Sequence, residues 1–428
     1  MNNEKMTSMK TVLSIAFASA VLATPISAQL TSASAATVGL ANSHGALATG
    51  FGAVGANPAR LGLKSNPSFS LALPTVRAGQ GTAPIGLGDV NRYAGEVIPH
   101  DQKVEWLNEI TRDDGLHGGA QIDASALSFN VGRIGFQHST YGVGGAQLTP
   151  DAAELLLFGN SGLSGQAGDF ALDGSTVNGA AFSSFGLAFG MPVSSSIAGE
   201  WSVGATMTYT IGHGVAVGTD LNSQVGSDPI EVDLEFPVLY SSDGAFSQGS
   251  GMGMDLGVAY ESAVLSLSVV AKSVFNTFSW ELDGLEYLPG QAFFDTSESS
   301  SDFEARPGSE APAELLESLN DFGFDPTLEL GAAFRVSPGT TLVVETKRRM
   351  GDGIEVGPKT HLGVGAERGM TPFLVLRSGL AAISDGYRLG GGATVILAGV
   401  NVTGGWAYQG GAVGAGNYFG FGLTFNAR

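Results

Sequence analysis

Several stretches of the chain alternate between apolar residues and small or polar ones, and this period of two constrains the fold more than any other feature. In WSVGATMTYTI, residues 201–211, apolar side chains occupy one face and serine, glycine and threonine the other. The pattern recurs in MGMDLGVAY (252–260), TLELGAAFRV (327–336) and NYFGFGLTF (417–425). Such alternation predicts β-strands with one apolar face. Positions expected on that face include Trp201, Val203, Met207, Tyr209, Met254, Leu256, Val258, Phe421, Leu423 and Phe425.

Two architectures place this apolar face differently. A soluble β-sandwich buries it in a core, whereas a transmembrane barrel turns it outward to lipid and keeps the lumen polar. The polar faces here carry glycine, serine and threonine rather than lysine and glutamate. A strand such as 201–211, tilted by ~40°, also rises about 25 Å, the height of a lipid-facing band. We therefore predict an all-β fold, a transmembrane antiparallel β-barrel, with a soluble sandwich as the alternative.

Further alternating or apolar segments complete the predicted barrel. The additional candidate strands are 67–77, 122–131, 132–141, 181–191, 263–272, 273–282, 340–349, 360–367, 371–381, 386–397 and 399–409. Bacterial single-chain barrels have even numbers of strands, so we expect about 14. The long insertions are expected to be extracellular loops, and they span 78–121, 142–180, 212–250 and 283–326. Three segments in them have helical character: HDQKVEWLNEITRDDG, TPDAAELLLFG and APAELLESLNDFG.

Charge and composition exclude several classes of protein. With 40 acidic and 20 basic residues the chain has a formal net charge of −20, and nucleic acid would be repelled. There is no cysteine, which excludes disulfides and thiolate metal sites. The six histidines lack metal-ligand spacing, and Asp220, Asp228 and Asp233 lack the pattern of a calcium-binding EF-hand. We expect no cofactor and no metal, and interpret the acidic loops as solvated, with calcium binding the alternative.

The N-terminus has the form of a secretory signal peptide. Lys5 and Lys10 precede the apolar stretch TVLSIAFASAVLATP, and small residues before a cleavage site follow, so we assign residues 1–28 to the signal peptide. A membrane anchor is the alternative. No later apolar run reaches the ~18–20 residues of a membrane helix.

The stretch ATGFGAVGANPARLG, residues 48–62, contains Gly50, Gly52 and Gly55 in the spacing of a dinucleotide-binding fingerprint. That fingerprint needs a preceding buried strand, a following helix and an acidic residue ~20 positions later. Here Asn57-Pro58 follows at once, and the next acidic residue is Asp89. We therefore reject dinucleotide binding.

The run GLANSHGALATGFGAVGANPARLGL, residues 39–63, instead resembles the N-terminal signature of the FadL superfamily of outer-membrane transporters, and Asn57-Pro58-Ala59 matches its Asn-Pro-Ala motif. The resemblance implies a 14-stranded barrel (67–428) with an N-terminal hatch (29–66) folded into the lumen. It also implies that a hydrophobic ligand enters from outside and leaves sideways through the wall. Gly50, Gly52, Gly55, Asn57, Pro58 and Ala59 would then serve structure or gating of the hatch.

One pair of residues raises the possibility of an enzyme. His138 and Ser139 are adjacent, as in FQHSTYG, but neighbouring residues on a strand point to opposite faces, so we expect no catalysis. The sequence thus predicts passive transport of hydrophobic small molecules across the outer membrane, with a non-transporting scaffold or surface-protein anchor as the alternative. Expected partners are outer-membrane lipid, a hydrophobic ligand and, through the C-terminal strand, the barrel-assembly machinery.

Overall fold

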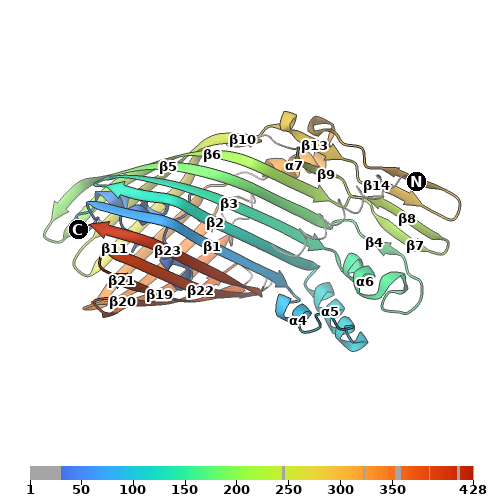
Figure 1. Ribbon diagram of the computed structural model, residues 1–428, viewed down its shortest axis with the longest axis horizontal. Coiled ribbons are helices and arrows are strands. Elements are labelled where there is room, and N and C mark those ends of the chain that lie inside the picture. The colour runs from blue at the N-terminus through green and yellow to red at the C-terminus, as the bar shows by residue number, and fades with distance from the viewer. Residues whose placement is uncertain are drawn as a thin grey trace.

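The computed structural model of the protein describes residues 30–242, 246–321, 324–351, 358–384, 386–411 and 415–427. Within this part of the chain, fourteen strands form a closed antiparallel barrel, and a smaller body of sheet and helices extends from one end (Figure 1). The barrel confirms the predicted fold class and strand number. The predicted signal peptide lies outside the described residues.

Each barrel strand pairs with the next one, and the first closes onto the last. The strands are β1 (Phe69–Ala83), β2 (Leu116–Val131), β3 (Ile134–Leu148), β5 (Thr176–Ser196), β6 (Gly199–Thr219), β10 (Gly249–Glu261), β11 (Leu265–Asn276), β17 (Thr327–Ser337), β18 (Thr340–Arg349), β19 (Thr360–Thr371), β20 (Leu374–Ile383), β21 (Gly386–Leu397), β22 (Val400–Gly411) and β23 (Ala415–Ala427). Pairing of β1 with β23 runs from Phe69 opposite Ala427 to Thr82 opposite Ala415, so the barrel has no free edge.

The two ends of the barrel differ. Short turns join the strands at the end where the C-terminus lies, which is termed the inner end (Figure 1). At the opposite end, termed the outer end, four connections are long. Their described residues, 84–115, 149–175, 220–242, 246–248, 277–321 and 324–326, form what is termed the outer body.

The outer body contains a small second sheet, short strands that extend the barrel wall, and the helices. Its elements are α4 (Leu87–Asn91), α5 (His100–Arg112), α6 (Pro150–Phe158), η2 (Gly159–Ser161), β4 (Phe170–Ala171), β7 (Gln224–Ser227), β8 (Ile230–Glu235), β9 (Val238–Ser241), β12 (Ser279–Trp280), η3 (Leu282–Gly284), β13 (Leu285–Leu288), β14 (Gln291–Phe294), β15 (Ser299–Asp302), β16 (Arg306–Pro307), η4 (Gly308–Glu310) and α7 (Ala313–Asp321). Helices α5, α6 and α7 lie where the sequence predicts helices. Among the described residues, no helix is both long and apolar enough to cross a membrane.

Two predictions about where strands begin and end are wrong. The predicted loops are too long, because β1, β2, β3, β5 and β6 extend well into them. These extensions are rich in glycine and alanine, which weakens the apolar alternation, yet the backbone pairing continues.

The predicted strand 273–282 is also wrong. It is the end of β11 followed by the two-residue β12. Ser273 has φ of 50°, and its N–H donates to Asp255 Oδ1 at 2.9 Å. The break in alternation at this point is therefore a bulge within one strand rather than a turn between two.

The apolar faces of the barrel strands point outward. Trp201, Met207 and Leu256 are 46%, 54% and 45% exposed, while Ser202 and Thr206 between them are buried. Of the other predicted positions, Tyr209, Val258 and Phe421 are exposed, and Val203, Met254, Leu423 and Phe425 are half-buried. This arrangement is that of a barrel with an apolar exterior and contradicts the sandwich alternative.

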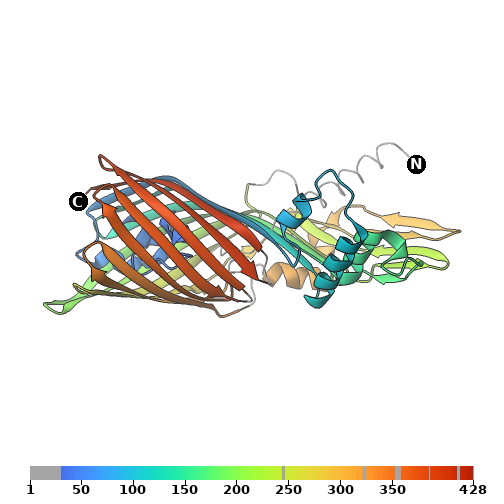
Figure 2. The same ribbon diagram turned by 90° about the horizontal axis from the view of Figure 1, so that it is seen from below.

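Residues 30–68, termed the luminal segment, lie inside the barrel toward its inner end (Figure 2). The segment contains α2 (Ala36–Gly39), α3 (Phe51–Ala56) and η1 (Pro58–Gly62), and most of its residues are buried. Helix α2 contacts β20 to β23, α3 contacts β1, β2, β3 and β5, and η1 contacts β5, β6 and β10. The segment thus touches the wall around most of its circumference.

Candidate functional site in the barrel lumen

Asn57 fixes the luminal segment to the wall through both ends of its amide. Its Oδ1 accepts from the backbone N–H of Ala59 at 3.0 Å and caps η1. Its Nδ2 lies 2.8 Å from Ser268 Oγ and 3.1 Å from the carbonyl oxygens of Val258 and Val269. The side chain is fully buried. One amide therefore ties the segment to both β10 and β11.

The glycine pattern around Asn57 serves close packing. Gly50 has φ of 57°, a conformation that favours glycine, and begins α3. A Cβ on Gly55 would lie 2.1 Å from the carbonyl oxygen of Thr31, whereas at Gly52 the nearest atom would be 3.4 Å away. Pro58 opens η1, where no N–H partner is needed. The predicted motif residues therefore come together in one buried turn that leaves no place for a dinucleotide phosphate.

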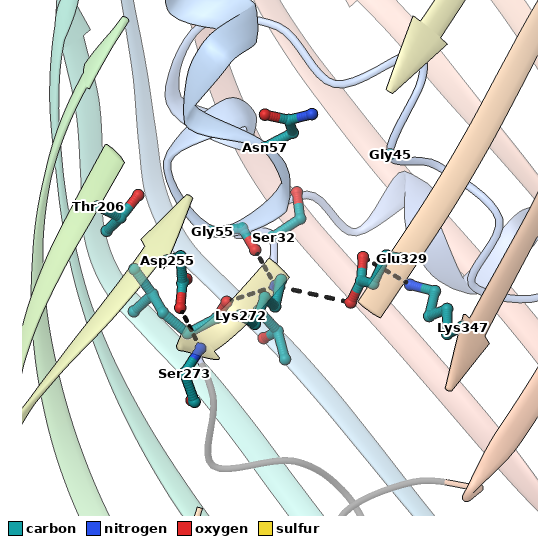
Figure 3. A network of polar contacts seen from close by, with 12 residues as sticks. Ser32, Gly45, Gly55, Asn57, Thr206, Asp255, Lys272, Ser273, Glu329 and Lys347 are labelled. Carbon is teal, nitrogen blue, oxygen red and sulfur yellow. Dashed lines mark hydrogen bonds and ion pairs between the residues drawn. The ribbon is translucent and has the colours of Figure 1, made fainter. Parts of the chain in front are cut away.

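Lys272 of β11 attaches a second part of the luminal segment. Its Nζ donates to the carbonyl oxygens of Leu30 at 2.9 Å and Gly55 at 2.5 Å, and lies 3.8 Å from Glu329 Oε1 (Figure 3). The lysine is 4% exposed. A buried ammonium group is costly unless it is paired and hydrogen-bonded, and here both conditions are met.

The ion pairs continue along the wall and return to the segment. Glu329 Oε2 lies 3.5 Å from Lys347 Nζ, which lies 2.8 Å from Glu345 Oε1. Glu345 Oε2 then accepts from the backbone N–H of Gly45 at 2.5 Å. Lys272, Glu329, Lys347 and Glu345, termed the ion-pair network, thus form a chain along the wall whose two ends both bond the luminal segment.

The sequence analysis missed the ion-pair network, although a signal was present. Glu329 and Lys347 lie on the inward faces of their strands, and Glu345 and Arg349 share that face of β18. Charged side chains on an inward face imply partners inside the barrel. Which charge meets which depends on pairing across β11, β17 and β18, which the sequence does not show.

A further ion pair holds the start of the luminal segment. Arg77 of β1 pairs with Asp123 of β2, and both contact the hydroxyl of Thr31. Arg77 also reaches the hydroxyl of Thr37 at 3.4 Å. The strand pairs β1–β2, β10–β11 and β17–β18 therefore all hold the segment through polar contacts, beside smaller apolar ones such as that of Leu61 with Ala188.

Two of the cavities beside the luminal segment meet at the loop that carries His44. One, of about 150 Å³, is lined by charged wall residues that include Arg77, Lys272, Lys347 and Arg388. The other, of about 200 Å³, is lined by polar residues of β19 to β23 and by the segment. His44 lines both, so the loop that carries it separates the two cavities.

Pro74 interrupts the barrel wall in β1, the strand that closes the barrel. The register between β1 and β23 shifts between Leu73 and Val76, and that between β2 and β3 shifts between Ser125 and Leu127 on the other side. Proline donates no ladder hydrogen bond. Two irregularities therefore lie side by side in this part of the wall.

An aromatic cluster lies above the luminal segment at the outer end. Phe182, fully buried, packs on Phe278 at 5.5 Å and Trp280 at 5.3 Å between ring centroids. Phe182 shares a face of β5 with Gly186, which faces Leu30. Phe278, Trp280 and Phe324 are half-buried. The outer mouth of the barrel is therefore apolar, and the lumen below it is charged.

The described residues include no group of three or more side chains arranged to hold a metal ion. Asp220, one of the predicted loop aspartates, accepts from the backbone N–H of Ser223 at 2.8 Å. Burial raises the pKa of its carboxyl, and the neighbouring Asp173 and Glu235 add to that effect. The residue acts within the outer body as a buried turn residue.

Comparison with known proteins finds a family and a set of similar folds. A family model described as "Family of unknown function (DUF5723)" matches residues 62–333. No curated protein matches the sequence. A FadL homologue from Pseudomonas aeruginosa is similar over 94% of this chain and 100% of its own, with 12% identity and a TM-score of 0.48. The toluene transporters TodX of Pseudomonas putida (95% and 99%, 11% identity, TM-score 0.47) and TbuX of Ralstonia pickettii (91% and 98%, 13%, 0.46) are similar as well. At these identities and TM-scores the similarities concern the fold alone.

Proposed function

The chain belongs to the DUF5723 family of unknown function, and we propose that it is an outer-membrane barrel that passes small hydrophobic molecules under the control of its luminal segment. The single observation that carries this proposal is the position of the segment, which fills the lumen between two cavities and is held by polar contacts with the wall. Polar contacts of this kind can be exchanged for water when the segment moves.

The apolar outer mouth supports a hydrophobic substrate. Phe278, Trp280 and Phe324 present partly accessible aromatic rings to a molecule that arrives from outside. Apolar molecules are attracted to such surfaces because their burial releases water. The charged cavity below does not favour the same molecule, since desolvating its charges is costly.

A sideways route avoids the charged cavity. The irregular pairing at Pro74 lies where the outward side chains Leu73, Val76 and Phe421 form part of the apolar exterior. A molecule that left the lumen there would pass directly into hydrocarbon. In this proposal the outward positions contact lipid, Asn57 and the glycine motif seat the segment, and the assembly machinery recognises β23.

A scaffold without transport is the second candidate. The charged and largely filled lumen favours it, because the ion pairs Lys272–Glu329 and Arg77–Asp123 also bond the segment and would keep it in place. In that case the outer body would be the functional part, held at the cell surface by the barrel.

An engineered disulfide between the luminal segment and the wall, which can be reduced again, distinguishes the two functions. The Cβ of Ala46 lies 3.4 Å from the position of a Cβ on Gly331, close to the Cβ separation of a disulfide. Because the chain has no cysteine, A46C/G331C would form a single bond between segment and wall. Uptake of the hydrophobic dye Nile red is measured in cells that express each variant.

Transport predicts uptake above that of cells without the protein, loss of uptake in the oxidised variant and recovery on reduction. The single variants A46C and G331C serve as controls and should resemble the parent. Uptake that is equal with and without the protein, or that does not respond to reduction, would favour the scaffold.

A further inference from the structure

A serine and a histidine lie together on the outward side of the barrel wall, where the serine is buried and the histidine half-buried. Ser183 Oγ of β5 lies 2.8 Å from His213 Nε2 of β6. The pairing of β5 with β6 passes from Gly212 to Gly214 and leaves His213 out of the ladder. The bulge therefore brings His213 to a serine that strict alternation would not have paired with it.

The hydrogen bonds of His213 fix its tautomer. Its Nδ1 lies 2.8 Å from the carbonyl oxygen of Phe246, which can only accept a hydrogen bond. Nδ1 of the neutral ring therefore carries the proton, and Nε2 presents its lone pair to the hydroxyl of Ser183. Thr140 Oγ1, 3.1 Å from Ser183 Oγ, then supplies a hydroxyl donor beside the serine. This is the arrangement of a nucleophile, a base and a group that orients the base.

The pair lies at the outer rim of the apolar exterior. Phe189, Leu187 and Phe185, successive outward residues of β5, are 51%, 59% and 38% exposed. Ser183 is the next outward position, and it is the first polar one in that run. A site at this rim meets the boundary between hydrocarbon and headgroups, where the ester bonds of amphiphiles lie. By contrast, Ser139, next to His138, points inward and bonds Ser125 at 2.7 Å.

We propose that Ser183 and His213 hydrolyse carboxylic esters of amphiphiles whose acyl chains lie along the barrel wall. Ser183 Oγ attacks the ester carbonyl carbon while His213 Nε2 takes its proton. The ester C–O bond breaks, and the leaving alcohol takes the proton from Nε2. Water, deprotonated by Nε2, then attacks the acyl-serine, and the carboxylic acid leaves as the proton returns to Ser183.

Neighbouring groups have defined roles in this reaction. The Phe246 carbonyl stabilises the imidazolium through Nδ1–H. Thr140 is placed to donate to the developing negative oxygen. Ser183 is only 7% exposed, and the ring of Phe246, 74% exposed and 4.8 Å from the imidazole, is the side chain that an acyl chain would displace.

The test uses the full chain, purified in detergent. A fluorophosphonate probe, which reacts with activated serines, is applied, and the labelled residue is located by mass spectrometry. Hydrolysis of p-nitrophenyl esters of short and long acids is followed in parallel. We expect labelling at Ser183, and a loss of hydrolysis of at least about 100-fold in S183A and H213N. H213N keeps a donor for the Phe246 carbonyl and removes the base.

A matched control lies one residue away. Ser184 faces the lumen and bonds Thr210 at 2.8 Å, so S184A should hydrolyse esters like the wild type. Heat-dependent migration in gels reports whether each variant folds. An unlabelled Ser183 in the folded wild-type protein, or S183A with wild-type hydrolysis, would overturn the proposal, and the labelling result holds even if a variant does not fold.

Discussion

Lys272 Nζ donates to the carbonyl oxygen of Gly55 at 2.5 Å, although 217 positions separate the two residues in the chain. Gly55 belongs to the luminal segment and Lys272 to the wall, so this hydrogen bond joins the part that would move to the part that stays. It also relates the glycine motif, found in the sequence, to the ion-pair network, found only in the structure. The predictions below follow from this attachment and from the two surfaces of the barrel.

Replacing Lys272 by methionine should release the luminal segment. The change removes two hydrogen bonds to the segment and leaves Glu329 with one partner fewer in a buried site. Breaking a buried ion pair costs about 3–5 kcal/mol, so the unfolding temperature in detergent should fall. K64M is the matched control, because the side chain of Lys64 is 78% exposed. Equal unfolding temperatures for wild type and K272M would contradict the role of the network.

Two glycines of α3 should respond differently to alanine. In G55A the new methyl group would meet the Thr31 carbonyl at 2.1 Å, so the turn must shift and the barrel should lose stability. In G52A the nearest atom is 3.4 Å away, and removing a helical glycine should be neutral or stabilise by about 0.5–1 kcal/mol. Thermal unfolding of both variants measures the difference. A similar loss in both would mean that helix flexibility matters here rather than close packing.

An arginine on the outer face tests the contact with lipid. Met207, near the middle of the apolar band of β6, is 54% exposed. M207R should destabilise the protein in lipid vesicles by about 2–4 kcal/mol, the cost of arginine at the bilayer centre. I230R, at a 59% exposed residue of the outer body, should have little effect. Urea titrations of folding into vesicles give both values, and equal effects would place Met207 outside the hydrocarbon.

The outer body should gain stability when Asp220 is replaced by asparagine. Burial raises the pKa of the Asp220 carboxyl in the folded state above its usual value of 3.8. A raised carboxyl pKa means that the folded state favours the protonated form, so ionisation of Asp220 lowers the stability of the folded outer body. This loss of stability is absent below the usual pKa and grows as pH rises through the raised one.

D220N keeps an acceptor for the N–H of Ser223 and removes the charge. Amide hydrogen exchange of β7 and β8 should therefore be slower in D220N than in wild type at neutral pH and equal in the two at strongly acidic pH. A difference in exchange between D220N and wild type that increases toward acidic pH would contradict a raised pKa at Asp220.

The barrel could be predicted from the sequence because its outward apolar residues recur at every second position. Trp201, Met207 and Leu256 are apolar, and their neighbours are small, which is enough to define strands and the outward face. The outer parts of β5 and β6 could not be predicted in the same way. Glycines interrupt them, and Val215 and Val217 of β6 are buried, so only pairing with neighbouring strands shows that they remain extended.

The candidate sites were predictable to different degrees. Gly55 and Asn57 stand in a local motif, so their neighbourhood was visible in the sequence although their packing role was not. The ion-pair network requires the order of strands around the barrel. The Ser183–His213 pair requires a bulge that shifts one residue out of alternation, and a strictly periodic interpretation hides it.

The seam between β1 and β23 sets an order of events for biogenesis. The first strand of the wall follows directly on the luminal segment, and it pairs with the last strand of the barrel in chain order. Once that pairing forms, the ring of strands is complete and the segment can no longer enter between two strands. We therefore expect the luminal segment to fold into place before β1 pairs with β23. A variant in which the segment folds slowly should accumulate closed barrels with an empty lumen.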